Sequence, residues 1–300
     1  MKTERLISLS IFQSIACVGT LLLFASAINT RAQYNFTTIL NPEGGVAYPE
    51  GIDGNNIVGY DGQESFLYDG TGYTILNVPN TVNTFAQGIS GNNIVGWYQD
   101  NAGSYYGFLY DGSSYAALSV PGATDTFAYG ISGNSIVGYY VNSSGNGSGF
   151  LYDGNNYTTI NVPGAQSTQA YGVSGDNVVG TYSTGSSAEG FLYNNGSYTT
   201  IDVPGSDQTD VFGISGNDIV GVYYDGSIVH GFLYDGNTYT AIDMPGATET
   251  VPYGISGSDI VGISITDGSV GGFLATPVPE PSALTLIAMG VGAFLVRRRR

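Results

Sequence analysis

Three features of the sequence predict an all-β fold built from repeated units. The tetrapeptide Gly-Phe-Leu-Tyr, or a near copy, recurs every 41 or 42 residues, with its phenylalanine at Phe66, Phe108, Phe150, Phe191, Phe232 and Phe273. Turns rich in Gly, Asn and Asp divide each unit into about four short strand-like segments. The array also begins and ends in the middle of a unit. Together these features predict a six-bladed β-propeller of four-stranded repeats.

The third copy shows the expected strands in order. A short first strand leads through a Ser-Gly-Asn turn into a second strand at 136–140, which is apolar on both faces and should therefore be covered on both. A loop of variable length precedes the third strand at 150–152. The Asp-Gly-Asn-Asn turn at 153–156 then forms a hairpin connection to an outer strand at 157–162, whose side chains alternate between apolar and polar.

The two ends of the array predict how the ring closes. The array starts with an outer strand, Phe36–Ile39, and ends with the strand that should precede it, Gly272–Leu274. In a ring, the N-terminal strand can complete the last blade and remove an open sheet edge. We therefore expect Phe36–Ile39 to lie beside Phe273. A β-helix is disfavoured because its coils use a much shorter repeat and parallel strands.

Charge is distributed unevenly along the chain. The formal net charge is −17, and the seven Lys and Arg residues stand at positions 2, 5, 31 and 297–300. Of the 24 acidic residues, all but Glu4 lie between Gln33 and Val296, which leaves 23 acidic and no Lys or Arg side chains there. Such a body repels nucleic-acid phosphate and anionic lipid, so no nucleic-acid partner is expected. No cofactor is expected either, although charge alone leaves weak surface Ca²⁺ binding open.

Residues 1–32 are organised like a secretory signal peptide, which we expect to be helical. A basic N-terminus precedes an apolar stretch at 11–24, and small residues follow. Cleavage is expected after Ala27 or Ala32, with a retained anchor as the weaker alternative. Cys17, the only cysteine, lies inside this segment without the leucine of a lipobox, so lipidation is disfavoured and the body has no disulfide.

The C-terminal 25 residues, 276–300, carry the most specific signal in the chain. Pro279-Glu280-Pro281 precedes a mostly apolar segment at 282–296, expected to be a transmembrane helix, and then Arg297, Arg298, Arg299 and Arg300. Fifteen helical residues span only about 22 Å, short of a bilayer core of about 30 Å, so the anchor is weak.

This tail resembles the PEP-CTERM sorting signal of Gram-negative and related bacteria. The resemblance implies recognition by an exosortase-type sorting enzyme, removal of the tail, and delivery to the cell surface or an exopolysaccharide matrix. An ordinary single-pass anchor is the alternative. The expected domains are therefore the signal peptide at 1–32, the propeller at 33–275 and the sorting signal at 276–300.

Three steps of the repeat, seen at His230-Gly231-Phe232, Gly172-Val173-Ser174 and Val178-Val179-Gly180, resemble the HAF-type extracellular repeats of bacteria. The resemblance covers roughly residues 34–275, although most copies lack the histidine. It implies no catalytic residue.

No catalytic or metal-binding residue is predicted. His230 fills a repeat position that varies among the copies, so we interpret it as exposed to solvent and not as a base or a metal ligand. Aspartates recur at one turn position, at Asp69, Asp111, Asp153 and Asp235, and are interpreted as turn formers. The Asp-x-Asp-x-Asp-Gly calcium loop is absent from the sequence.

A ligand is predicted on the face of the disc that carries the variable second-to-third loops and the crossovers between units. Tyrosines exposed there could stack on sugar rings. The candidate residues on this face are Asp100, Tyr105, Asp125, Glu189, Asp207, Asp210, Tyr224, Asp225 and Glu249.

The leading functional prediction is a non-enzymatic interaction or structural module associated with extracellular matrix or exopolysaccharide. The protein would be exported, tethered to the inner membrane by its C-terminal helix, and then delivered to the surface or the matrix. The alternative is an extracellular carbohydrate-active enzyme that uses carboxylates in the central channel. Such an enzyme should break the repeat with unpaired acids in one or two units, and the copies are interpreted as too alike for that. A spacer without a ligand is a third possibility.

Overall fold

The computed structural model describes residues 34–185 and 187–278, which contain strands, turns and loops and no helix. Within these ranges, no helix long and apolar enough to cross a membrane is present. The predicted signal peptide at 1–32, the Pro-Glu-Pro motif and the apolar segment at 282–296 lie outside the described residues.

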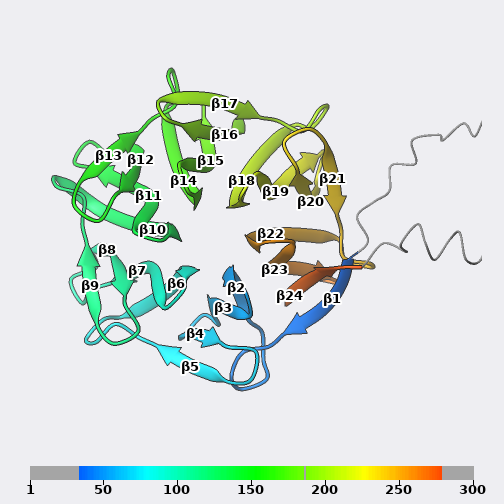
Figure 1. Ribbon diagram of the computed structural model, residues 1–300, viewed down its shortest axis with the longest axis horizontal. Coiled ribbons are helices and arrows are strands. Elements are labelled where there is room, and N and C mark those ends of the chain that lie inside the picture. The colour runs from blue at the N-terminus through cyan, green and yellow to red at the C-terminus, as the bar shows by residue number, and fades with distance from the viewer. Residues whose placement is uncertain (1–33, 186, 279–300) are drawn as a thin grey trace, which may run out of the picture. The chain divides into compact units, whose positions relative to one another are not determined.

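The strands form a ring of sheets that radiate from a central axis (Figure 1). Four separate four-stranded sheets run from the axis outward in chain order: β2 (Tyr48–Asp53), β3 (Asn56–Tyr60), β4 (Ser65–Tyr68) and β5 (Tyr73–Leu76); β6 (Asn83–Ser90), β7 (Asn93–Gln99), β8 (Tyr105–Tyr110) and β9 (Tyr115–Leu118); β10 (Ala123–Ser132), β11 (Ser135–Asn142), β12 (Gly147–Tyr152) and β13 (Tyr157–Ile160); β14 (Ser167–Ser174), β15 (Asn177–Ser183), β16 (Ala188–Asn194) and β17 (Ser197–Ile201).

The other eight strands belong to one larger sheet. Its members are β18 (Gln208–Ser215), β19 (Asp218–Asp225), β20 (Ile228–Tyr234), β21 (Tyr239–Ile242), β22 (Glu249–Ser256), β23 (Asp259–Thr266), β24 (Ser269–Pro277) and β1 (Tyr34–Ile39). The sequence predicts six separate blades, whereas the described chain has four separate sheets and this double one. The difference comes from a single parallel pair, Val229 with Glu249, which joins the antiparallel unit β18–β21 to the unit formed by β22, β23, β24 and β1.

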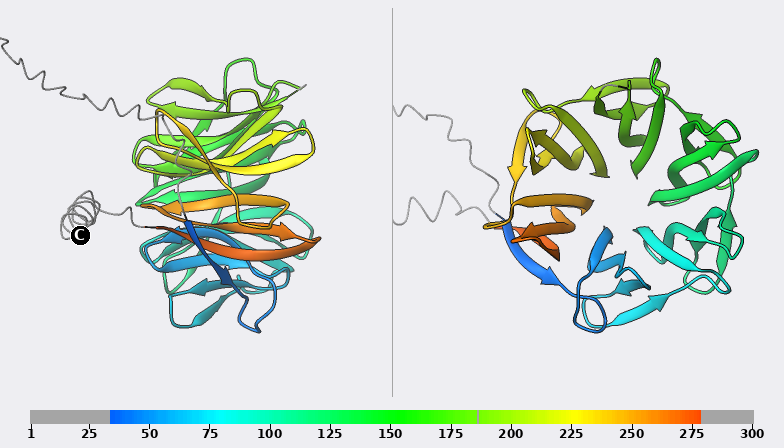
Figure 2. Two further views of the ribbon diagram at one scale, coloured as in Figure 1. Left: turned by 90° about the vertical axis from the view of Figure 1, so that its right-hand side faces the viewer. Right: turned by 180° about the vertical axis from the view of Figure 1, so that it is seen from behind.

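The N-terminal strand completes the last unit of the ring, as predicted. β1 pairs antiparallel with β24, and Thr38 lies opposite Phe273. The rings of Phe36 and Phe273 meet edge to face with their centroids 5.4 Å apart. Figure 2 shows β1, in blue, alongside the orange β24. The first and last strands of the array therefore pair with each other in one sheet, which closes the ring.

The repeated phenylalanine is the centre of the packing between sheets. All six copies are at most 1% exposed. Phe108, for example, packs in a cluster that also contains Val58 and Leu76 of the preceding sheet. A further cluster joins Phe66 to Val261 of β23 and so carries the core across the closure of the ring. Burying such side chains supplies the main favourable term in folding.

Each innermost strand contains a β-bulge at the same repeat position. In β10 the pairing with β11 shifts between Ala128 and Gly130, so Tyr129 is the extra residue. Strand β11 lies very close to β10 at this point. A Cβ on Gly138 of β11 would overlap the carbonyl oxygen of Phe127 of β10. A bulge bends the strand and redirects the side chain of the extra residue. Here that side chain points toward the axis.

The two faces of the ring are built differently. We call the face that carries the first-to-second strand turns the short-turn face, and the face that carries the second-to-third connections and the crossovers the loop face. On the short-turn face, the oxygen of one side chain per unit accepts a hydrogen bond from a turn glycine N–H of the next unit, over 2.6 to 3.5 Å. We call these acceptors the serine ring: Ser90, Ser132, Ser174, Ser215 and Ser256, with Asp53 in the first unit.

Buried threonines fix the crossovers that lead to the loop face. In five crossovers, the N–H at the Val-Pro-Gly step donates to a threonine Oγ1 six residues later over 3.0 to 3.1 Å. Thr168, which accepts from Val162, is 1% exposed. A buried donor that lost such an acceptor would be costly, so the repeated threonine has a structural role.

The aspartates at the outer hairpin turns form those turns, as predicted. Asp153 Oδ1 accepts from the N–H groups of Asn155 and Asn156 over 2.8 and 2.7 Å. These backbone hydrogen bonds lower the pKa of the Asp153 carboxyl. Gly154 adopts φ +96° between them, a conformation that favours glycine.

Candidate functional site

The six bulge residues line the central channel. They are Glu50, Gln87, Tyr129, Tyr171, Phe212 and Tyr253, each immediately before a Gly-Ile-Ser or Gly-Val-Ser step, or Gly-Ile-Asp in the first unit. They lie on β2, β6, β10, β14, β18 and β22, the strands nearest the axis (Figure 1). Since every unit contributes one such residue, all units meet at the channel wall.

A cavity of about 340 Å³ occupies the part of the channel toward the loop face. Tyr60 and Trp97 join the six bulge residues in lining it. Tyr60 is the last residue of β3 and Trp97 lies near the end of β7, so both approach from the loop-face ends of second strands. A smaller hollow of about 80 Å³ continues past the Gly-Ile and Gly-Val steps toward the short-turn face.

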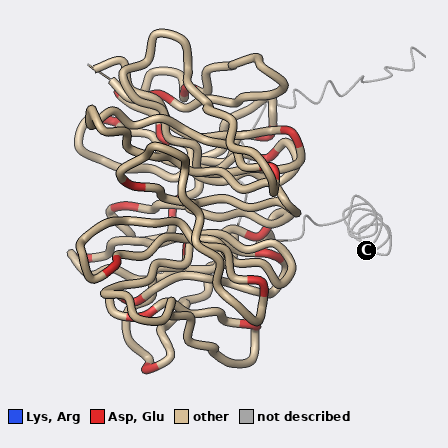
Figure 3. Tube along the Cα trace, turned by 90° about the vertical axis from the view of Figure 1, so that its left-hand side faces the viewer, with Lys and Arg blue, Asp and Glu red and all other residues tan. Residues whose placement is uncertain are grey.

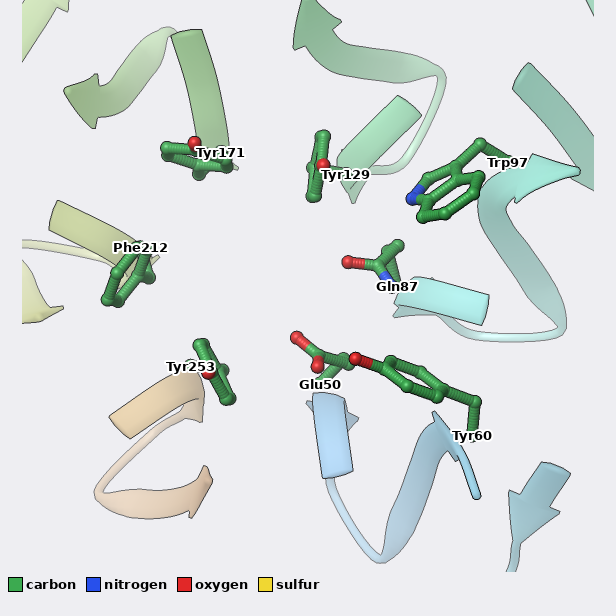
Figure 4. A pocket seen from close by; sticks show the side chains of 8 residues that line it. All are labelled: Glu50, Tyr60, Gln87, Trp97, Tyr129, Tyr171, Phe212 and Tyr253. Atoms are coloured by element: carbon green, nitrogen blue, oxygen red, sulfur yellow. The ribbon is translucent and has the colours of Figure 1, made fainter. Parts of the chain in front are cut away.

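Aromatic rings surround more than half of this cavity. Tyr129 meets Tyr171 edge to face with centroids 5.0 Å apart, and contacts of 5.6 and 5.4 Å continue through Phe212 to Tyr253. On the other side, Trp97 stacks on Phe85 at 4.0 Å. Figure 4 shows the rings of Tyr129, Tyr171, Phe212, Tyr253 and Trp97 around a common central space. Rings held in mutual contact form a rigid apolar wall.

Glu50 breaks the aromatic wall with a carboxylate, which Figure 4 shows pointing into the central space. Among the described residues it is the one carboxylate that lines the cavity, and no hydrogen bond or ion pair engages it. Burial raises the pKa of the Glu50 carboxyl to about 8. Burial, together with the nearby Glu50 charge, also raises the pKa values of Tyr60 and Tyr253.

Trp97 supplies an unused hydrogen-bond donor to the same cavity. Its Nε1 atom is buried and has no hydrogen-bond partner among the described residues. Figure 4 shows this nitrogen on the cavity side of the indole, with the Gln87 amide oxygen also directed inward. A buried donor without a partner costs free energy, and at a cavity wall a ligand acceptor can remove that cost.

Most of the acidic residues predicted for the loop face accept hydrogen bonds from nearby protein groups. Asp100 Oδ1 accepts from the N–H groups of Ala102 and Ser104 within its own turn. Asp125 accepts from the Tyr105 N–H at 3.2 Å, and the Tyr105 ring packs against Trp97 and Phe127. Asp125 and Tyr105 therefore lie together, and the Tyr105 ring contacts Trp97 of the channel wall.

The remaining sequence candidates lie on other strands. Glu189 Oε2 accepts from the Tyr182 hydroxyl at 2.6 Å, and Asp207 accepts from the Gly226 N–H at 2.9 Å. Asp225 is exposed at the end of β19. Among the described residues, no hydrogen bond links Glu189 with Asp207 or Asp225.

A small group forms around Asp210 of β18. Asp210 accepts from the Gln208 side chain at 2.7 Å, and burial raises the pKa of its carboxyl. Burial and the nearby charges of Asp210 and Glu249 raise the pKa of Tyr224. The structure thus brings Asp210, Tyr224 and Glu249 together. In the described ranges, no three His, Cys, Asp or Glu side chains come together as a metal cluster.

His230 lies outside the channel lining. Its Nδ1 is 3.2 Å from Asp243 Oδ2, and its ring stacks on Tyr223 with centroids 5.0 Å apart. The side chains of His230 and Asp243 are 27% and 31% exposed. Figure 3 shows the other acidic residues scattered over the ring, with no Lys or Arg among the described residues.

Sequence reasoning missed the channel residues, although the repeat contains a signal for them. The position before the Gly-Ile or Gly-Val step reads Glu, Gln, Tyr, Tyr, Phe and Tyr in the six units. The copies are therefore not too alike for an unpaired acid, and that part of the prediction is wrong for Glu50. An alignment of the copies shows the exception, but only the bulge shows that it faces the axis.

Comparison with solved structures supports the fold at low sequence identity. SapL1 lectin in complex with alpha methyl fucoside is 12% identical, with 79% of this chain and 97% of the lectin covered and a TM-score of 0.50. An acylaminoacyl peptidase from Pyrococcus horikoshii is 12% identical, with 85% and 49% covered and a TM-score of 0.50. The β-propeller domain of the Trilobed protease from Pyrococcus furiosus is 9% identical, with 83% and 88% covered and a TM-score of 0.48. A comparison with curated proteins gives no match.

The fold therefore defines an all-β, propeller-like protein with repeated four-stranded blades. Residues 277–300 match the PEP-CTERM protein-sorting motif, which confirms that part of the sequence interpretation. The motif implies a secreted, surface-sorted protein that is anchored at its C-terminus before an exosortase processes it. The HAF-type resemblance of the repeats is not confirmed by these comparisons.

Proposed function

We propose that the protein is a non-enzymatic module that binds a polysaccharide of the extracellular matrix at the loop-face mouth of its channel. The double sheet counts as two blades, so the ring is a six-bladed propeller. A signal peptide at 1–32 directs export, and the segment at 282–296 holds the protein in the inner membrane. The exosortase then removes the tail and releases the propeller to the surface or the matrix.

The observation that carries this proposal is the aromatic cavity. A cavity of about 340 Å³ lies within the usual range of small-ligand sites, roughly 300–1,000 Å³. Its walls are mostly rings, and its polar groups are few and directed inward, which is the composition typical of such sites. Aromatic faces contact the apolar faces of sugar rings, while groups such as Gln87 and Trp97 Nε1 satisfy hydroxyl groups.

The carboxylates favour binding over hydrolysis. Glycosidases place two carboxyl groups about 5 to 9.5 Å apart across one sugar ring. Of the described residues, Glu50 alone brings a carboxylate to the cavity wall. Asp210 lies near Tyr171 and Tyr224, outside the residues that line the cavity, and accepts hydrogen bonds from its own surroundings. A single carboxyl group lacks the partner that the reaction requires.

One observation favours the second candidate, a carbohydrate-active enzyme. A buried carboxyl group with a pKa of about 8 is protonated at neutral pH, as a general acid must be. In this candidate, Glu50 protonates the leaving oxygen and a water replaces the second carboxylate.

The two candidates separate in one experiment. The full-length protein is incubated with the producer's own matrix polysaccharide, with and without Ca²⁺, and bound protein and released oligosaccharide are both measured. Retention without release supports the binding module, and Tyr171→Ala should then weaken retention at least about tenfold through the lost ring contact. Release that Glu50→Gln abolishes supports the enzyme. Absence of both retention and release contradicts the proposed function.

A further inference from the structure

We propose that the channel recognises a protonated amine, with the ammonium group of an amino-sugar unit held between the Glu50 carboxylate and the aromatic rings. The amino-sugar source rests on the proposed function, since it makes the ligand part of a matrix polysaccharide. The chemistry of the site itself, one carboxylate in an aromatic wall, is independent of that source. The inference therefore identifies a protonated amine as the chemical group that the cavity binds.

The first argument is a carboxyl group without a partner, which is neutral below a pH of about 8 and becomes an unpaired charge when it loses its proton. Glu50 is half-buried in the channel wall and faces the cavity, and its carboxylate has no hydrogen-bond donor or cationic partner among the described residues. No Lys or Arg occurs anywhere between residues 32 and 296, so the folded body has no basic side chain of those types to offer. A buried carboxylate is costly unless it is paired. A ligand cation is the partner that the channel lacks.

The second argument is the chemistry of the wall. Aromatic faces carry a negative electrostatic potential and attract ammonium groups within about 6 Å of the ring centroid. Tyr129, Tyr171, Phe212 and Tyr253 follow one another around the cavity. Tyr60 lies beside Glu50, and Trp97 lies next to Gln87 (Figure 4). An aromatic enclosure with one carboxylate suits an organic cation better than a neutral ring. It suits Ca²⁺ poorly, because Ca²⁺ takes six to eight oxygen ligands.

The titratable groups that face Glu50 do not compete with this role. They are the hydroxyls of Tyr60 on β3, Tyr129 on β10 and Tyr253 on β22. Burial raises the pKa of each, so these phenols remain neutral through pH 9. The charge of the channel between pH 6 and 9 is therefore set by Glu50 alone among the residues that line it.

The third argument concerns the rest of the ligand. The buried Trp97 Nε1–H has no acceptor among the described residues, and the Gln87 oxygen points into the same space. A sugar hydroxyl can accept from the first and donate to the second. A simple tetraalkylammonium ion can do neither. Trp97 therefore distinguishes an amino sugar from a bare cation.

The test measures binding to the full-length protein by titration calorimetry with four probes: glucosamine, N-acetylglucosamine, tetramethylammonium and glucose. Glucosamine should bind at least about tenfold more tightly than its N-acetylated form, which has the same ring without the charge. Glu50→Gln should remove this preference. Glu43→Gln, which removes an exposed carboxylate outside the channel, should keep it.

Two further measurements identify the site. Tetramethylammonium carries a charge that does not change with pH, so its affinity should rise as pH increases from 6 to 9 and Glu50 loses its proton, and Glu50→Gln should make it constant. Trp97→Phe keeps an aromatic ring but removes the N–H, so it should weaken glucosamine binding several-fold and leave tetramethylammonium binding unchanged.

Equal affinity for glucosamine and N-acetylglucosamine would overturn the inference, as would a preference that survives Glu50→Gln in a folded variant. If ammonium probes fail while matrix polysaccharide is still retained, the inference fails and the proposed function stands. If ammonium binding depends on Glu50 but no polysaccharide is retained, the channel chemistry is supported and the matrix role fails. Binding of tetramethylammonium without glucosamine would overturn the amino-sugar assignment.

Discussion

The short-turn face and the channel wall are both built from the innermost strands, but their residues repeat on the short-turn face and vary in the channel wall. On the short-turn face, each unit repeats one task, in which a side-chain oxygen accepts a glycine N–H from the next unit. In the channel wall, the residue at the bulge changes from unit to unit and reads Glu, Gln, Tyr, Tyr, Phe and Tyr. Positions that repeat identify the framework of the ring, and positions that depart from the repeat identify where ligand chemistry can lie.

Strand β2 shows both behaviours within four residues. Asp53 replaces serine on the short-turn face, but its carboxylate still accepts the Gly91 N–H, at 2.6 Å. Glu50 replaces an aromatic or amide side chain in the channel and finds no partner. An acidic side chain therefore keeps the hydrogen bond between units at position 53, whereas at position 50 it leaves a carboxyl group without a partner.

The largest expected effect comes from breaking the bulge that both regions share. Gly138→Ala places a Cβ against the carbonyl oxygen of Phe127, and neither backbone can move without disrupting the pairing of β10 with β11. We expect a loss of about 3 kcal/mol or more in the free energy of unfolding, measured by denaturant titration. Gly147→Ala is the matched control in the same sheet, because its Cβ would meet only Ser167 Cβ at 3.8 Å. Equal stability of the two variants would contradict this account of the bulge.

The next effect tests the unmet charge in the channel. The Glu50 carboxyl has a folded-state pKa of about 8, raised from 4.5 by burial, so between these values the folded protein keeps a proton that the unfolded chain has lost. Stability must therefore fall as pH rises from about 4.5 to about 8, and stay lower above it. Because the Glu50 side chain is only half-buried, we expect Glu50→Gln to remove this loss and to be about 2 kcal/mol more stable than the parent at pH 9, less than the roughly 5 kcal/mol of the full shift, with little difference at pH 4.

Unfolding titrations at pH 4, 7 and 9 measure this difference. Glu43→Gln, on the exposed surface, should follow the parent at all three pH values. A constant offset between Glu50→Gln and the parent across the pH range would show that burial does not disfavour the Glu50 charge.

The sequence predicts the framework well because the framework is what repeats. The phenylalanine period, the turn aspartates such as Asp153 and the strand Phe36–Ile39 that completes the last unit all follow from local patterns copied along the chain. The joining of two units into one sheet does not follow, because it depends on one parallel pair, Val229 with Glu249.

The channel could not be predicted for a different reason. Alternation along a strand normally tells which side chains share a face. The bulge between Pro49 and Gly51 inserts one extra residue, so alternation no longer gives the direction of Glu50. The acidic residues proposed from the loops, such as Asp100, have the opposite problem. They look exposed in sequence, but accept backbone hydrogen bonds in their own turns.

A smaller effect tests the crossover threonines that support the loop face. Thr168→Val keeps the shape of the side chain but leaves the Val162 N–H without its acceptor. We expect a loss of about 1 kcal/mol in the free energy of unfolding. Thr158→Val, on the exposed face of β13, is the control and should change stability by less than about 0.5 kcal/mol. If both substitutions have the same effect, the threonine hydrogen bond does not hold the crossover.

The smallest effect concerns the serine ring. Ser174→Ala removes one acceptor, that of the Gly216 N–H at 3.0 Å, at a partly exposed position where water can replace the lost hydrogen bond. The expected loss is therefore only about 0.5 kcal/mol, against a control of Ser269→Ala at the exposed first position of β24. Ammonium and polysaccharide binding should remain unchanged in Ser174→Ala, because the substitution lies on the short-turn face. A loss of binding in this variant would show that the two faces are coupled through the inner strands, and the separation of framework from ligand chemistry would have to be abandoned.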